Sequence, residues 1–141
     1  MAKYAGIDCV LKKTISAALV AIAQVRDIKG PGMTSKPIDV STRDSPGKFM
    51  EFIAGMRDGG EVTFDLVFDP DLASHSLSVA GGLGSAFTLG TVDVYTITFS
   101  DVVPTVATFS ALVIKYEPKA PYNDALTADV TLKVTGLLTY A

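Results

Sequence analysis

The sequence is poor in the residues from which reactive and metal-binding sites are built. It holds one cysteine, Cys9, one histidine, His75, and no tryptophan. A lone cysteine excludes an internal disulfide, and with one histidine it leaves only scattered carboxylates, which excludes the common zinc sites. No nucleophile motif surrounds His75, so we expect a surface or packing residue there. We therefore predict no enzyme, no cofactor, and no catalytic or metal-binding residues.

Positive charge is missing from a long central part of the chain. No Lys or Arg lies between Arg57 and Lys115, and the net charge of the whole chain is −3. Such a balance argues against a surface that grips nucleic acid through its phosphates. The base-free stretch carries seven acids: Asp58, Glu61, Asp65, Asp69, Asp71, Asp93 and Asp101. They form either one acidic surface or ordinary solvated strand faces and turns, and the sequence leaves both interpretations open.

Apolar runs long enough to cross a bilayer as a helix are also missing. The nearest approach follows Lys12-Lys13 and covers about residues 14–23, where two bases and a short apolar run imitate a signal peptide. The run starts late and continues directly into a strand pattern, so we favour a strand. We predict no membrane partner. Cleavage of this run in a secreted protein is the alternative.

What the sequence does have is period-two alternation, broken by Gly, Pro, Asn and Asp, which is typical of strands joined by turns. Hydrophobic residues make up 48% of the 141 residues, enough for one domain over residues 1–141. We expect strands at about residues 18–28, 35–42, 61–68, 92–99, 106–117 and 126–135. The predicted fold is mainly β, a β-sandwich or partial barrel with one short α-helix.

Two local features refine this prediction. In the strand 61–68, Val62, Phe64 and Leu66 alternate with polar residues, and Leu126 to Val134 alternate in the same way. Asp71 is a plausible helix N-cap, which predicts a short helix over about residues 71–79 and a loop over 81–90.

The segment at about residues 35–56 combines many turn signals with apolar residues, among them Ile38, Val40, Phe49 and Phe52. We expect a long arm or loop, because an exposed segment with this much apolar surface usually finds a partner. The alternative is that these side chains cover the core of their own subunit.

Several motifs in a fixed order resemble the tail tube proteins of siphovirus-type long-tailed bacteriophages. They are Ile28-Lys-Gly-Pro-Gly32, Ile38-Asp-Val-Ser-Thr42-Arg-Asp-Ser45, Asp58-Gly-Gly-Glu61, Phe68-Asp-Pro70 and Leu126 to Gly136. The resemblance covers about residues 20–70 and 106–136, and the order and spacing of the motifs carry it.

This resemblance implies a virion structural protein made in the cytoplasm of the bacterial host. Subunits would form hexameric rings that stack into a hollow tail tube, through which phage DNA passes without specific binding. It further implies tape-measure, tail initiator and tail terminator proteins as partners.

Within this picture we expect the polar residues Glu61, Thr63 and Asp65 to face the lumen, and Ile38, Val40, Phe49 and Phe52 to contact another subunit or ring. Two alternatives stay open: the tube protein of a contractile tail or secretion apparatus, and a secreted β-sandwich binding module.

Overall fold

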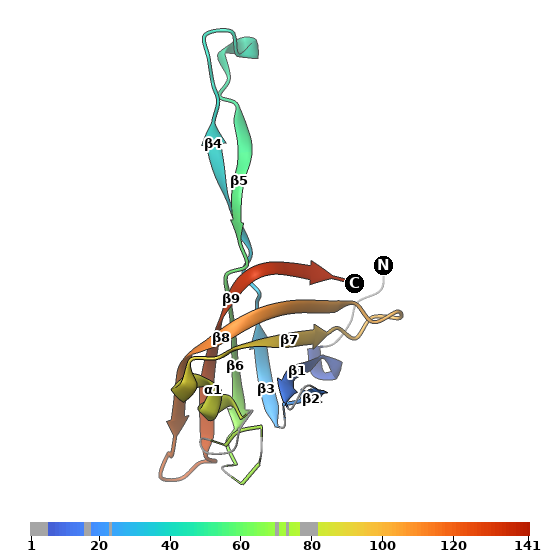
Figure 1. The fold of residues 1–141 in the computed structure, drawn as a ribbon, viewed down its shortest axis with the longest axis vertical. Helices are drawn as coiled ribbons and strands as arrows, with labels where there is room; N and C mark the ends of the chain where they lie inside the picture. Colours follow the sequence, from blue (N-terminus) through green and yellow to red (C-terminus); the bar gives the residue numbers. More distant parts are fainter. Residues whose placement is uncertain (1–5, 16–17, 23, 70, 73, 77–81) are drawn as a thin grey trace.

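The computed structural model describes residues 6–15, 18–22, 24–69, 71–72, 74–76 and 82–141. A seven-stranded antiparallel sheet forms the body, in the order β2-β1-β7-β8-β9-β6-β3 (Figure 1). Its strands are β1 (Val10–Ile15), β2 (Ala18–Ala21), β3 (Val25–Lys29), β6 (Glu61–Val67), β7 (Val92–Thr98), β8 (Val106–Lys119) and β9 (Thr127–Tyr140). A short 3-10 helix, η1 (Gly6–Asp8), precedes β1. The structure confirms the prediction of a mainly β fold with one helix.

The sheet is strongly curled, which follows from its connectivity. Strands β2 and β3 are its two edges, yet only residues 22–24 separate them in the sequence. Three residues reach roughly 10–14 Å across at most, so the two edges must lie near each other. The prediction of one strand over about residues 18–28 is therefore wrong. Gln24, with a φ of 59°, lies where the chain leaves one edge for the other.

The inner face of the curled sheet forms the core. Val62, Phe64 and Leu66 of β6 are all at most 4% exposed, as the alternation predicts. Strand β9 contributes Ala128, Val130, Leu132 and Val134 in the same way. Apolar and polar residues alternate along both strands, because one face of each strand packs inward and the other faces solvent.

The core also contains a lysine that the sequence does not reveal. Lys13 of β1 is fully buried, and its Nζ lies 3.1 Å from Asp93 Oδ2 and 5.8 Å from the centre of the Tyr95 ring. Tyr95 is fully buried as well, and burial raises the pKa of its hydroxyl far above the usual range. The ion pair and the ring offset the cost of removing an ammonium from water.

The helix lies elsewhere than predicted. Helix α1 covers Leu83–Leu89, within the segment expected to be a loop, and packs against β8. Its buried residues Leu83 and Ala86 stabilise the helix by packing, which helix propensity alone does not predict. Gly90, with a φ of 67°, ends the helix in the left-handed conformation. The described residues from Asp71 to Ser76 form turns, whereas residues 77–79 lie outside the described part of the chain.

An arm extends from the body as a separate two-stranded sheet. Strands β4 (Thr34–Asp39) and β5 (Phe52–Asp58) pair antiparallel, and the short 3-10 helix η2 (Pro46–Lys48) lies at the tip. Figure 1 shows this hairpin projecting well beyond the seven-stranded sheet. A hairpin thus occupies the segment at about residues 35–56, and every residue of β4 is exposed. That it reaches another subunit stays a prediction.

The neck that joins the arm to the body is built from closely approaching glycines. A Cβ on Gly60 would collide with the carbonyl of Gly32, and one on Gly30 would collide with the carbonyl of Glu61. Both glycines have positive φ, 74° for Gly60 and 109° for Gly30. Only glycine fits these positions without strain, because it lacks the Cβ and tolerates positive φ.

We expect Gly60→Ala to destabilise the subunit, since the positive φ costs roughly 1–2 kcal/mol before the collision is counted. The thermal midpoint measured by circular dichroism should fall by at least about 5 °C. Gly32→Ala is the matched control, because nothing lies within 4 Å of a Cβ there and its φ is not positive. Equal midpoints for the two variants would contradict this account of the neck.

Candidate assembly surfaces

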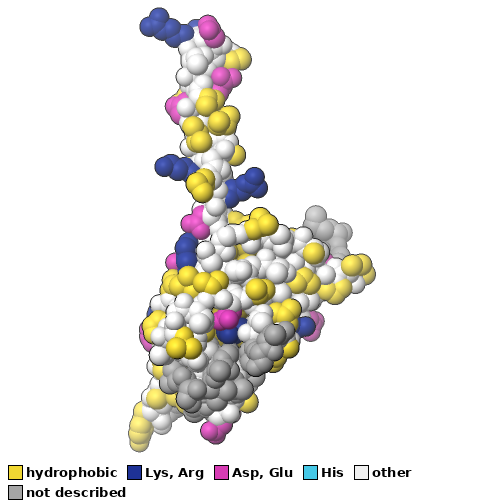
Figure 2. Space-filling model, viewed as in Figure 1, with side chains coloured by type: hydrophobic (Ala, Val, Ile, Leu, Met, Phe, Trp, Pro, Cys, Tyr) yellow, Lys and Arg dark blue, Asp and Glu magenta, His cyan; other side chains and the backbone are white. Residues whose placement is uncertain are grey.

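The arm presents most of the exposed large apolar side chains of its half of the chain. Phe49 is 77% exposed and Met56 is 90% exposed, values far outside those of the core. The remaining ones are Met33, Ile38, Val40, Met50, Phe52 and Ile53, each between 39% and 65% exposed. Figure 2 shows apolar side chains along the length of the arm. These residues do not cover the core of their own subunit, so that alternative is wrong.

Polar contacts hold the tip of the arm in one shape. The Ser45 hydroxyl is buried, accepts a hydrogen bond from the Thr42 N–H at 2.9 Å and donates to Glu51 Oε2 at 2.9 Å. The Glu51 N–H donates to Ser41 Oγ at 2.7 Å, which ties the two sides of the tip together. Hydrogen bonds from Ser41 also lower the pKa of the Asp39 carboxyl. The tip is therefore an ordered loop that holds Phe49 out toward solvent.

The second surface is the outer face of the sheet, where β3, β6, β9 and β8 lie side by side. Glu61, Thr63 and Asp65 all lie on this face, opposite the core side chains of β6. Their partners across β9 are Lys133, Thr131 and Asp129, respectively. The three predicted residues are thus brought together on one polar face.

Ion pairs on this face interleave acids and bases. Asp65 lies 3.9 Å from the Arg26 guanidinium, Asp129 pairs with Lys119 and Glu117 pairs with Lys115. The carboxylate of Asp129 raises the pKa of the Lys119 ammonium. The base-free stretch of the sequence therefore does not form a base-free surface, because β6 pairs with strands that carry Lys and Arg.

At the edge of this face, Lys133 links the body to the arm. Its ammonium donates to Asp58 at 3.1 Å, and the Gly60 N–H donates to the same carboxylate at 2.9 Å. These two hydrogen bonds, that of Gly60 first, lower the pKa of Asp58. This contact joins β9 of the body to the end of β5 in the arm.

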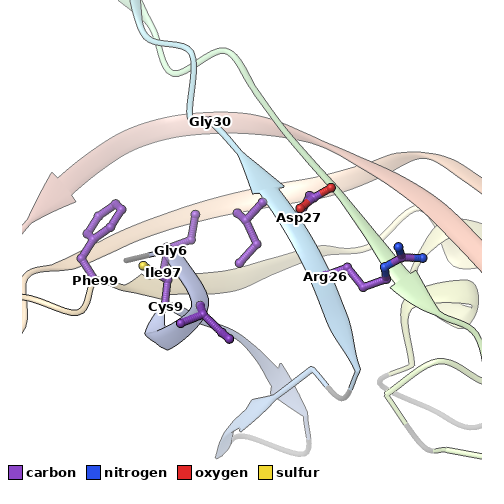
Figure 3. Close-up of a pocket in the computed structure, with 9 residues that line it drawn as sticks. Gly6, Cys9, Arg26, Asp27, Gly30, Ile97 and Phe99 are labelled. Carbon is purple, nitrogen blue, oxygen red and sulfur yellow. The ribbon is translucent and has the colours of Figure 1, made fainter. Parts of the chain in front are cut away.

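A cleft of about 470 Å³ lies between β3 on one side and η1 with the end of β7 on the other. Figure 3 shows Arg26 and Asp27 on β3 at one side, with Gly6 and Cys9 at the other and Phe99 beyond them. Among the described residues, no group of three His, Cys, Asp or Glu side chains could hold a metal ion.

The comparison of the sequence with known families decides the identification. A sequence profile described as "Lambda phage tail tube protein, TTP" matches residues 4–141. The chain belongs to the lambda phage tail tube protein family. The resemblance found in the motifs is thereby confirmed. No curated protein sequence matches the chain.

Solved structures share the fold of this tail tube family member. A chain from the tail of an empty gene transfer agent particle, refined with C6 symmetry, has a TM-score of 0.76 at 17% identity, covering 99% of both chains. A chain of the SPP1 tail tube has a TM-score of 0.71 at 10% identity, covering 98% of this chain and 78% of that one. A chain of the PVC extracellular contractile injection system, from its sheath/tube terminator, has a TM-score of 0.60 at 12% identity, covering 94% and 93%.

Two further observations bear on the sequence predictions. His75 is fully buried: its Nδ1 accepts a hydrogen bond from the Asp69 N–H at 3.2 Å, and its carbonyl accepts one from the Tyr116 hydroxyl at 2.8 Å. Burial raises the pKa of Tyr116 to about 12. The histidine packs on the Phe68 ring, so it is a structural residue. Within the described part of the chain, no helix has the length and apolarity to span a bilayer.

We expect Ser45→Ala to loosen the arm tip, because it removes both hydrogen bonds of the buried hydroxyl. Limited trypsin digestion should cleave after Arg43 several-fold faster than in the unmodified chain, while the thermal midpoint of the body stays unchanged. Ser35→Ala, on an exposed arm position, is the control and should be cleaved at the original rate. Unchanged cleavage in Ser45→Ala would show that Ser45 does not order the tip.

Proposed function

We propose that this chain is a structural subunit that forms hexameric rings, and that the rings stack into the hollow tail tube through which DNA passes. The family assignment and the C6 symmetry of a tail with the same fold support this proposal. The observation that carries it is the arm, a paired hairpin whose large apolar side chains are exposed in the part of the subunit that the structure describes. A two-stranded hairpin is marginal on its own, so packing against another subunit would stabilise it.

In this proposal Ile38, Val40, Phe49 and Phe52 contact a neighbouring subunit. Burying side chains of this kind contributes about 1.5–3 kcal/mol each, which a ring of identical subunits multiplies. The protein acts by assembling, not as an enzyme. Tape-measure, tail initiator and tail terminator proteins would set the length and the two ends of the tube.

The outer polar face, with Glu61, Thr63 and Asp65, lines the bore in this proposal. Its alternating acids and bases offer no extended positive surface to hold phosphates, so a duplex can pass without being bound. The face is also rich in threonine, which remains hydrated without adding charge.

A tube protein of a contractile system is the second candidate, favoured by the likeness to the PVC injection system chain. The family profile and the higher TM-score of the SPP1 tail tube chain favour the non-contractile tail. Detection of a sheath protein around purified particles would decide for the contractile system.

The apolar anchors are tested by replacing Phe49 and Phe52 with Ser. We expect a folded subunit with an unchanged thermal midpoint that no longer forms rings or tubes in negative-stain micrographs. Phe64→Ser is the comparison variant, because Phe64 lies in the core and is 4% exposed. Its loss should lower the free energy of unfolding by about 3–5 kcal/mol. Tubes formed normally by the Phe49 and Phe52 variant would refute the role of these anchors.

The lumen assignment is tested by thiol labelling of Thr63→Cys in a Cys9→Ala background. Free subunits should react with a small maleimide and with a maleimide attached to a large protein. Assembled tubes should react with the small reagent alone, since only it can diffuse along the bore. Labelling of tubes by the large reagent would place Thr63 outside, and loss of labelling by both would place it in an interface.

A further inference from the structure

Stacked rings of identical subunits bring opposite ends of the molecule together. Such a contact is heterologous, so a surface at one end must complement a different surface at the other end. This inference rests on the proposed stacking, and it concerns which residues recognise the next ring. In Figure 1 the arm leaves one end of the body, while the β8–β9 turn and the connection after β6 lie at the opposite end.

The lower half of the arm is basic. Lys36 is the basic residue of β4 and Arg57 that of β5, and both are exposed. Arg57 pairs with Ser35, the residue that precedes Lys36, so the two bases lie at the same level of the hairpin. Figure 2 shows dark blue side chains on both sides of the arm above the neck. The nearby acid, Asp58, is engaged by Lys133, which leaves the charges of Lys36 and Arg57 uncompensated by the ion pairs described for this chain.

The opposite end of the body is acidic. The connection after β6 carries Asp69 and Asp71, and the β8–β9 turn carries Asp124. No Lys or Arg occurs in residues 68–91 or 120–126 of the sequence. The nearest base, Lys119, is paired with Asp129. Beside Asp124, Tyr122 is 99% exposed and offers an apolar contact at the same end.

We propose that Lys36 and Arg57 of one subunit dock on Asp71 and Asp124 of a second copy of this chain in the next ring. Asp71 and Asp124 are exposed, whereas Asp69 is partly buried and is therefore the less available acid. Charge complementarity between the two ends of one chain is the argument for a second copy as the partner. The contact gives stacking a single direction, since two arms, or two acidic ends, would repel each other.

Each exposed ion pair contributes little alone, but six equivalent sets act together at every ring junction. The contact should therefore matter most at low salt, because exposed charges are screened over a Debye length of about 8 Å at physiological ionic strength. The apolar tip of the arm lies beyond the two bases, so in this proposal it packs on a more distant part of the subunit in the next ring.

Charge exchange between the two ends tests the proposal. One variant carries Lys36→Glu with Arg57→Glu, a second carries Asp71→Lys with Asp124→Lys, and a third carries all four changes. The exposed positions of these side chains should leave the fold intact, which circular dichroism checks. Lys12→Glu with Lys29→Glu, at two bases of the body outside the arm and the acidic end, serves as the control for the change of net charge in the first variant.

Tube formation is measured by sedimentation and negative-stain microscopy over a range of salt concentrations. We expect each two-site variant to form single rings and about tenfold fewer tubes at low salt. The four-site variant should recover tube formation to within about twofold, because its ends are complementary again. The control should assemble like the unmodified chain.

Three results would overturn this inference while leaving the proposed function intact. The first is normal tube formation by the two-site variants, and the second is a four-site variant no better than they are. The third is two-site variants that remain monomers, which would move the contact to the sides of the ring. Failure of the unmodified chain to form rings or tubes would contradict the proposed function itself.

Discussion

The close approach of the two sheet edges is the constraint on which the rest of the structure depends. Because residues 22–24 must bridge β2 and β3, the seven strands can only curl into a nearly closed barrel. The curl separates an apolar interior from a polar exterior. It also places η1 and β3 around one cleft, and in the part of the chain that the structure describes no cluster of His, Cys, Asp or Glu there could hold a metal ion.

Apolar side chains fill the interior of the curled sheet, so contacts with other molecules must use its outer face, its ends or the arm. The arm differs most from an ordinary surface loop, since its strands are paired and its tip is held by a buried serine. At the same time its apolar side chains remain exposed. An ordered and apolar projection has the properties of an interaction element that is shaped before its partner arrives, which lowers the entropy lost on binding.

Sequence reasoning worked best where one physical signal dominated. Alternation identified the inner faces of β6 and β9 residue by residue, and turn signals with misplaced apolar residues identified the arm. Glu61, Thr63 and Asp65 were placed on one face for the same reason. Prediction from the sequence failed where tertiary packing overrode the local residue pattern. Helix α1 forms in a glycine-rich segment because its buried residues Leu83 and Ala86 pack on the body of the subunit. The apolar run before Lys29 conceals a break at Gln24.

Long-range pairing was the other limit, because sequence order does not tell which strands are neighbours. The buried Lys13 is stable only beside Asp93, 80 residues later in the chain. The same holds for the charges of the outer face. The acids of β6 look uncompensated along the sequence, and become neighbours of Arg26 and Lys133 only once the sheet has formed.

That interleaving has a consequence for anything that slides past the outer face. Charges of opposite sign a few ångströms apart cancel within a short distance, so their combined potential decays faster than that of either charge. A passing polyanion would meet neither an attractive trap nor a repulsive barrier, only a hydrated and nearly neutral wall. Friction on such a wall would depend little on the ionic strength of the medium, inside a cell or outside it.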